Sequence, residues 1–216
     1  MIPTKRESRA VYLHGSSIAS GENEYFSVFE EKKSLLVCGS AHPSSDSRGN
    51  IACPRALDIA VDCFLERPSS SETAVETIAG FINEEIYGLQ EKDKAFLCSI
   101  AMLYVFKGST RVFPAGNAAV LFYENGVLKN EWYGDGTPMG MKPECRFIYS
   151  DEFELTEDSR FILVTGENRE FVGSAVDFFK DNNGNGPEDP DEFFKGRQCS
   201  FVNLFLPKRE RRGFLR

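Results

Sequence analysis

Apolar and polar residues alternate early in the chain as they do in β-strands. Two such stretches, residues 24–30 and 34–39, flank the polar turn 31–33 and predict a β-hairpin. A short apolar piece at 11–13 is also β-like, and residues 40–50, which are rich in Ser, Gly and Asn, predict an irregular loop. We therefore expect the chain to open with β-structure.

Two stretches that follow carry apolar residues at helical spacing. The first comes after Pro54, a residue suited to the first turn of a helix, and its apolar face comprises Ala56, Ile59, Ala60, Cys63 and Phe64. The second begins near Ser71, a suitable cap, and stops at Gly88. Its apolar stripe comprises Val75, Ile78, Ala79, Ile82 and Ile86. We expect two helices, each burying one face.

The pattern returns to β-structure from residue 95. The predicted strands are 96–106, 111–115, 118–123, 127–133, 147–155, 160–165 and 200–206, with a helix over 171–180. The Asn125-Gly126 pair is a strong signal for a hairpin turn. This order of elements predicts an α+β fold, a layered αββα sandwich of two antiparallel sheets flanked by helices.

Length and charge narrow the class of protein. The chain has 216 residues, and we expect a single domain over residues 1–207 followed by a basic tail, 208–216, that is either an interaction segment or a solubilising end. The formal net charge of −8 argues against nucleic acid or an anionic membrane as partner. No apolar run approaches the roughly 20 residues of a membrane span.

Cysteine usage points to a compartment. The chain has six cysteines and two histidines, and no two cysteines form a CxxC pair, which argues against a zinc site. Several of the cysteines lie in apolar runs, as buried thiols do. We therefore expect a reducing, cytoplasmic environment.

Five segments resemble motifs of one phosphatase family. Residues 113–122, 136–141 and 153–166 are similar to the "NAGHNPPLL", "GxPLGL" and "xLxxGDxLLLYTDG" motifs of the SpoIIE/RsbU-type serine phosphatases, a branch of the metal-dependent PPM, or 2C-type, protein phosphatases. Residues 23–29 resemble "GDFYDVF", and 35–40 resemble the strand that leads into "GDVSGHG". The resemblance spans residues 21–206 and implies the PPM fold.

The resemblance also implies a metal site, most of whose ligands this sequence lacks. Members of the family hydrolyse phosphoserine or phosphothreonine with paired Mg²⁺ or Mn²⁺ ions, which Asp residues bind at four places. The first place falls on Glu24, which keeps a carboxylate. The second falls on Ser40, or on Cys38 if the register slips, and the third falls on Gly166. The fourth falls on Gln198-Cys199, where both carboxylates are lost.

Two further carboxylates could rebuild part of that site. Glu167 would return a ligand after a shift of one residue, and Asp46 lies in the loop after the second predicted strand. A dinuclear site with one or two carboxylates would hold Mn²⁺ or Mg²⁺ weakly or not at all, because the charge of the ions needs compensation. We therefore hypothesise a pseudophosphatase that binds a regulatory protein or phosphoprotein in signalling. The alternative is a divergent, active Mn²⁺- or Mg²⁺-dependent serine/threonine phosphatase with a rebuilt site, so the sequence leaves the enzymatic activity open.

A second motif lies outside that resemblance. Residues 181–192 match the calcium-loop pattern D-x-[DN]-x-[DN]-G-x₅-E. The side chains that would bind Ca²⁺ are Asp181, Asn183, Asn185 and Glu192. Pro187, Pro190 and Glu188, the last at a position that is usually apolar, count against the motif. The segment is therefore either a modest Ca²⁺ site or an acidic surface loop, and we favour the loop.

Overall fold

The computed structural model describes residues 17–20, 26–31, 34–41, 48–66, 71–106, 109–144, 147–154, 159–185 and 199–206. One sheet has the strand order β2 (Phe26–Glu31), β3 (Ser34–Ala41), β4 (Ser99–Phe106), β5 (Ser109–Ala115) and β8 (Phe153–Glu154). The other has the order β1 (Ser17–Ser20), β10 (Cys199–Leu206), β9 (Ser159–Gly166), β6 (Ala118–Glu124) and β7 (Val127–Tyr133). All neighbouring strands are antiparallel.

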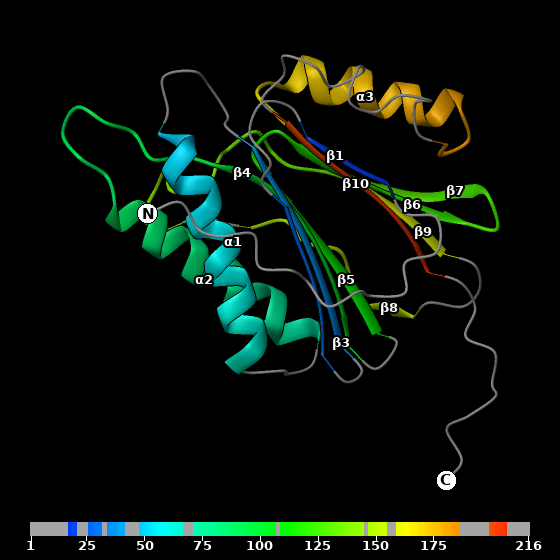
Figure 1. Cartoon of the computed structure of the whole chain (residues 1–216), viewed down its shortest axis with the longest axis horizontal. Coiled ribbons are helices and arrows are strands. Elements are labelled where there is room, and N and C mark those ends of the chain that lie inside the picture. The colour runs from blue at the N-terminus through cyan, green and yellow to red at the C-terminus, as the bar shows by residue number, and fades with distance from the viewer. Residues whose placement is uncertain are drawn as a thin grey trace, which may run out of the picture.

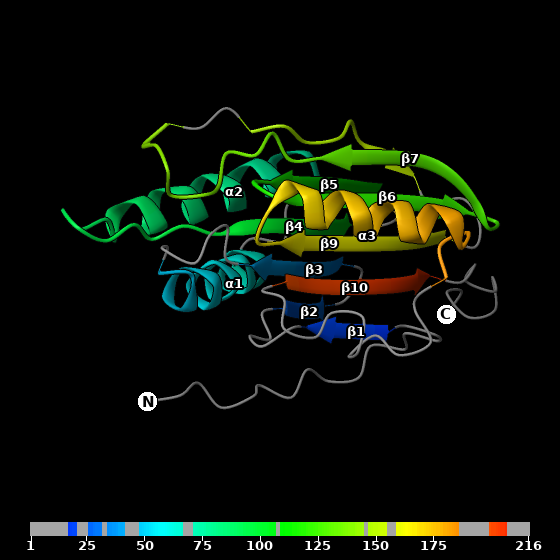
Figure 2. The same cartoon turned by 90° about the horizontal axis from the view of Figure 1, so that it is seen from above.

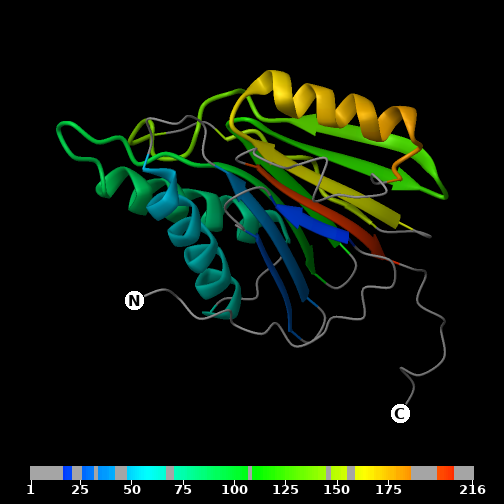
Figure 3. The same cartoon turned by 45° about the horizontal axis from the view of Figure 1, so that its top comes forward.

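The sheets stack face to face, and helices cover their outer faces. Helices α1 (Gly49–Glu66) and α2 (Ser71–Gly88) lie together on the β2–β8 sheet, and α3 (Arg169–Asp181) lies along the other sheet (Figures 1 and 3). Viewed from above, α3 runs across β6 and β9, while α1 and α2 lie on the far side of the sandwich (Figure 2). The predicted α+β class and αββα layering are thus confirmed.

Strand alternation sorts the apolar side chains into three cores. In β3 and β4, Cys38 and Met102 pack under α1 and α2, whereas Val37 and Leu103 face the opposing sheet. In the second sheet, Val164 faces α3. Because both faces of each central strand are covered, these strands are apolar almost throughout, which is why the sequence shows continuous apolar runs there.

Most predicted elements are confirmed, including the hairpin of β2 with β3 and the turn at Asn125-Gly126. Both turn residues have positive φ, 51° and 75°, as a two-residue hairpin turn of this kind requires. The predicted start of the first helix is wrong, since α1 begins at Gly49 and contains Pro54 in its interior. Proline removes a hydrogen bond to the carbonyl of Asn50, which the helix tolerates because Asn50 lies at its exposed beginning.

The predicted strand over 147–155 is also largely wrong, since only Phe153–Glu154 pair as a strand. The ladder is interrupted because a side chain replaces a main-chain partner. The Ser150 N–H donates to the Val112 carbonyl at 3.0 Å, and the Val112 N–H donates to the Ser150 hydroxyl at 3.1 Å. In the described part of the chain, no helix is long and apolar enough to cross a membrane.

Candidate functional site: the end of the sandwich that holds the predicted ligand positions

Three of the predicted ligand positions lie at the same end of the two sheets. Gly166 and Cys199 are direct neighbours across β9 and β10, and Ser40 lies one residue from the end of β3, opposite Ile100. The turn after β5 joins the two sheets here, since the Asn117 carbonyl accepts from the Gly166 N–H at 3.0 Å. The topology therefore brings together positions that are far apart in sequence, as the family resemblance requires.

Asn117 links the two sheets at this end through hydrogen bonds. The sequence analysis did not single out this residue. Its N–H donates to the Ser99 hydroxyl of β4 at 2.9 Å, and its side-chain amide donates to the Glu167 carbonyl at 3.1 Å. One residue thus links both sheets through main-chain and side-chain contacts. The only sequence signal was its place in the Gly-Asn turn between two apolar strands.

A carboxylate at position 166 would require the Phe171 ring to move. A Cβ atom built on Gly166 would overlap Cδ1 of Phe171, and it would lie 3.0 Å from Cε1 of that ring and 3.2 Å from Cγ2 of Val172. The helix cap fixes the main chain of Phe171 next to Gly166, because the Phe171 N–H donates to the Asn168 side-chain oxygen at 2.8 Å. The start of α3 therefore fills the place that a metal-binding Asp would need.

Cys199, the neighbour of Gly166, lies in an apolar environment. Its side chain is 1% exposed and belongs to the core between the second sheet and α3, together with Val164 and Phe201. A core of this kind offers no further oxygen ligands to a hard cation. Cys199 therefore contributes to the apolar core, and its buried thiol does not suit Mg²⁺ or Mn²⁺ as a ligand.

Ser40 is buried on the other side of its sheet, toward α1. Strand alternation puts it on the same face as Cys38, and its hydroxyl makes no hydrogen bond within the described residues, although it lies near the Cys53 thiol. Burial, followed by the neighbouring Cys98, raises the pKa of Cys53 well above the usual value for a thiol. Burial likewise raises the pKa of the Cys38 thiol. Because Mg²⁺ and Mn²⁺ prefer oxygen ligands and thiolates suit softer metals, these cysteines are poor replacements for the missing carboxylates.

The remaining candidate ligands are only partly visible. Glu24, Asp46 and Gln198 lie outside the described residues. Glu167 is half-buried at the correct end of the sandwich. Within the described ranges, no three His, Cys, Asp or Glu side chains are grouped to hold a metal ion. The positions that the structure does describe do not fit a dinuclear Mg²⁺ or Mn²⁺ site.

The proposed calcium loop begins with a helix end. The Gly184 N–H donates to the Phe179 carbonyl at 2.7 Å, and the Asn183 N–H donates to the Lys180 carbonyl at 3.2 Å. Asn183 has a positive φ of 52°, so the three features together form a Schellman C-cap. The Asn- and Gly-rich composition of this segment is therefore explained by the way α3 ends.

Three of the four predicted calcium ligands, Asp181, Asn183 and Asn185, lie at that helix end. Asp181 is exposed as the last residue of α3. The Asn185 side-chain oxygen accepts from a guanidinium nitrogen of Arg160 at 3.2 Å, which puts a positive charge beside a proposed cation ligand. Glu192 lies outside the described residues, so the calcium site stays a prediction.

Two amide side chains organise the segment around 140–143, that of Asn83 in α2 and that of Gln90 two residues after its end, and the sequence analysis missed both. The Asn83 amide donates to the Lys142 carbonyl at 3.0 Å and to the Pro143 carbonyl at 3.3 Å, and its oxygen accepts from the Gly140 N–H at 2.9 Å. Gln90 donates to the Gly140 carbonyl at 2.9 Å. The available signal was a polar residue, Asn83, next to the apolar stripe of the helix.

Comparison with known proteins identifies the fold. No family model matches the chain, and no curated protein matches it in sequence. The PPM Ser-Thr phosphatase MsPP from Mycobacterium smegmatis is similar in structure, with a TM-score of 0.57 and 11% identity, over 91% of this chain and 99% of that one. RsbX, solved in complex with magnesium, gives a TM-score of 0.52 and 12% identity, over 88% of this chain and 94% of that one.

A third similar structure comes from the branch that the sequence motifs indicated. It contains the PP2C phosphatase domain of the cell fate determinant SpoIIE from Bacillus subtilis and a fragment of its regulatory domain, with a TM-score of 0.59 and 12% identity. The match covers 90% of this chain and 64% of that one. The chain therefore has the fold of the PPM, or 2C-type, serine/threonine phosphatases.

Proposed function

We propose that this chain is a pseudophosphatase, which keeps the phosphatase fold, has lost hydrolysis and acts by binding a regulatory protein in signalling. The observation that carries the proposal is the packing of Phe171 on Gly166, since a metal-binding carboxylate at position 166 would collide with that ring. The apolar burial of Cys199 next to Gly166 supports it.

The site lacks the negative charge that two divalent ions would need. Two divalent ions close together repel one another and need several carboxylates in contact with them. The end of the sandwich presents a glycine and a buried thiol on the α3 side, and a buried hydroxyl on the α1 side. We expect Mn²⁺ and Mg²⁺ to bind weakly or not at all, and a cytoplasmic location agrees with the buried thiols.

The test is turnover. Mn²⁺-dependent hydrolysis of a generic phosphate ester and of phosphopeptides should equal the blank, with an active phosphatase of the same fold as positive control. Calorimetric titration with Mn²⁺ should give no saturable heat.

Turnover that disappears in Glu24→Ala or Glu167→Ala would overturn this proposal in favour of the divergent active phosphatase. The half-buried position of Glu167, one residue from Gly166, makes it the variant to compare first. Its control is Glu170→Ala, which removes an exposed carboxylate from the first turn of α3 and should leave any turnover unchanged.

A further inference from the structure

A small cavity opens beside the end of β5, between two of the segments that carry the family motifs. Its volume is about 190 Å³. Its apolar lining comprises Phe113, Pro114, Ala115, Phe147 and Ile148, and its polar lining comprises Asp135, Thr137, Lys142 and Glu144. Cavities that combine apolar side chains with a few convergent polar groups are the usual form of a binding site for a small molecule.

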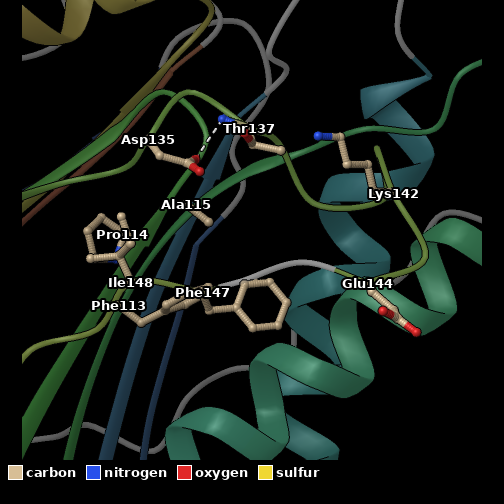
Figure 4. Close-up of a pocket in the computed structure, with 9 residues that line it drawn as sticks. All are labelled: Phe113, Pro114, Ala115, Asp135, Thr137, Lys142, Glu144, Phe147 and Ile148. Atoms are coloured by element: carbon tan, nitrogen blue, oxygen red, sulfur yellow. Dashed lines mark hydrogen bonds between the residues drawn. The ribbon is translucent and has the colours of Figure 1, made fainter.

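Two opposite charges face the cavity from different sides. Figure 4 shows the Asp135 carboxylate on one side and the Lys142 ammonium on the other, with the Phe147 ring across the floor below them. Glu144 lies farther out and points away from both (Figure 4). The cavity therefore offers an anion, a cation and an apolar surface to the same ligand.

The surrounding contacts hold these groups in place. The Asp135 carboxylate accepts from the Thr137 N–H at 2.7 Å, and Arg169 of α3 donates to the Asp135 main-chain carbonyl. The backbone of Lys142 is bound to Asn83 of α2. Because the Asp135 carboxylate and the main chain of Lys142 are already tethered, a ligand that matches both charges would have to order the exposed Lys142 side chain but not the backbone of either segment.

The floor is equally well defined. Phe113 is fully buried, and its ring meets that of Phe147 edge to face at 5.4 Å. Ile148 is 53% exposed and supplies the outer part of the floor. The volume of the cavity, about six water molecules at roughly 30 Å³ each, is below the roughly 300–1,000 Å³ of pockets that hold drug-sized ligands.

We propose that this cavity binds a free α-amino acid with an apolar side chain. Asp135 would bind its ammonium, Lys142 would bind its carboxylate, and the side chain would lie on Phe147 and Ile148. A carboxylate that accepts one hydrogen bond from Thr137 retains capacity for the ligand. None of the predicted metal positions is among the lining residues, and a bound ligand would contact the segment that Asn83 of α2 binds.

The test compares three related probes in titrations followed by the NMR shifts of the Thr137 and Ile148 amides. The probes are L-phenylalanine, 3-phenylpropionate, which lacks the ammonium, and phenethylamine, which lacks the carboxylate. L-Phenylalanine should bind with about millimolar affinity, and each analogue should bind up to about fivefold more weakly, as expected for the loss of one exposed ion pair.

Charge-removing variants should change these preferences separately. Asp135→Asn keeps an oxygen for the Thr137 N–H and should abolish the preference for L-phenylalanine over 3-phenylpropionate. Lys142→Gln should abolish the preference over phenethylamine. Ile148→Ser should weaken all three probes alike. Asp93→Asn and Lys92→Gln, in the exposed turn after α2, are the matched controls and should change neither preference.

Three results would overturn the proposal. One is the absence of shifts at these amides up to the solubility limit of L-phenylalanine. Another is equal binding of L-phenylalanine and both analogues. The third is a preference over 3-phenylpropionate that survives in Asp135→Asn. None of these results bears on phosphate-ester hydrolysis, so the two proposals stand or fall separately.

Discussion

The two helical layers close the same end of the sandwich in different ways. Under α3, two of the predicted metal positions are packed with apolar groups, with Phe171 on Gly166 and Cys199 in an apolar core. Under α2, the side chains of Asn83 and Gln90 bind main-chain groups of the 140–143 segment. Apolar packing fills the end of the sandwich on the α3 side, whereas hydrogen bonds order the 140–143 segment on the α2 side. The small-molecule site that we propose accordingly lies on the α2 side.

The substitution with the largest expected effect introduces a carboxylate at position 166, next to α3. Gly166→Asp should lower the free energy of unfolding by at least about 3 kcal/mol, because the new side chain overlaps Phe171 and buries a charge without a partner. Urea denaturation measures the change.

The matched control is Gly173→Asp in α3, where an added Cβ has no neighbour within 4 Å. Its cost should be much smaller. If Gly166→Asp were as stable as Gly173→Asp, position 166 would have room for a ligand, and the contrast between the two layers would fail.

A second substitution removes the Asn83 side chain, which binds the 140–143 segment on the α2 side. Asn83→Ala should cost about 2–3 kcal/mol, because the Gly140 N–H and the Lys142 and Pro143 carbonyls lose their partner at a site where Asn83 is only 3% exposed. Hydrogen exchange at the Gly140 amide should become faster.

Asn130→Ala on the exposed strand β7 serves as the control and should be nearly neutral. An Asn83→Ala variant with unchanged stability and unchanged exchange at Gly140 would show that packing alone orders the 140–143 segment. The two layers would then be alike.

The smallest effect concerns a surface contact between α3 and β7. The hydrogen bond from Lys180 is the main cause that lowers the pKa of Glu131, and the hydrogen bond to Glu131 raises the pKa of Lys180. Both groups are partly exposed, so Glu131→Gln should cost no more than about 1 kcal/mol at pH 7.

The pH dependence follows from the direction of the two shifts. The Glu131 contribution is present above the unfolded-state pKa, for which the usual value is 4.5, and is lost as pH falls through the lower folded-state pKa. The Lys180 contribution is present below its usual pKa of 10.5 and is lost as pH rises through the higher folded-state value. Thermal melts at acidic pH should therefore show equal stability for wild type and Glu131→Gln. A difference that persists there would mean that the contact is not electrostatic, and Glu84→Gln is the exposed control.

The sequence by itself determined the layers and most of the elements. Period-two alternation, the Asn125-Gly126 turn and the apolar stripe of α2 each report local geometry, which depends on residues close together in the chain. It also predicted Ser40, Gly166 and Cys199 as former ligand positions, and this assignment stays a prediction, although the strands bring the three residues to the same end of the sandwich. It failed at Pro54 and at Ser150, where a solvent-exposed helix start and a side-chain hydrogen bond override the local pattern.

Only the tertiary structure decided what occupies each of those positions. The sequence shows that position 166 is a glycine and therefore has no carboxylate. The structure shows that Phe171, five residues later, packs on it, because the cap at Asn168 sets where α3 begins. The placement of Asp135 and Lys142 around one cavity, and the hydrogen bonds of Asn83 to a segment some sixty residues away, also depend on contacts between distant elements. No local pattern encodes such contacts, because the strand order of the sheets brings them together.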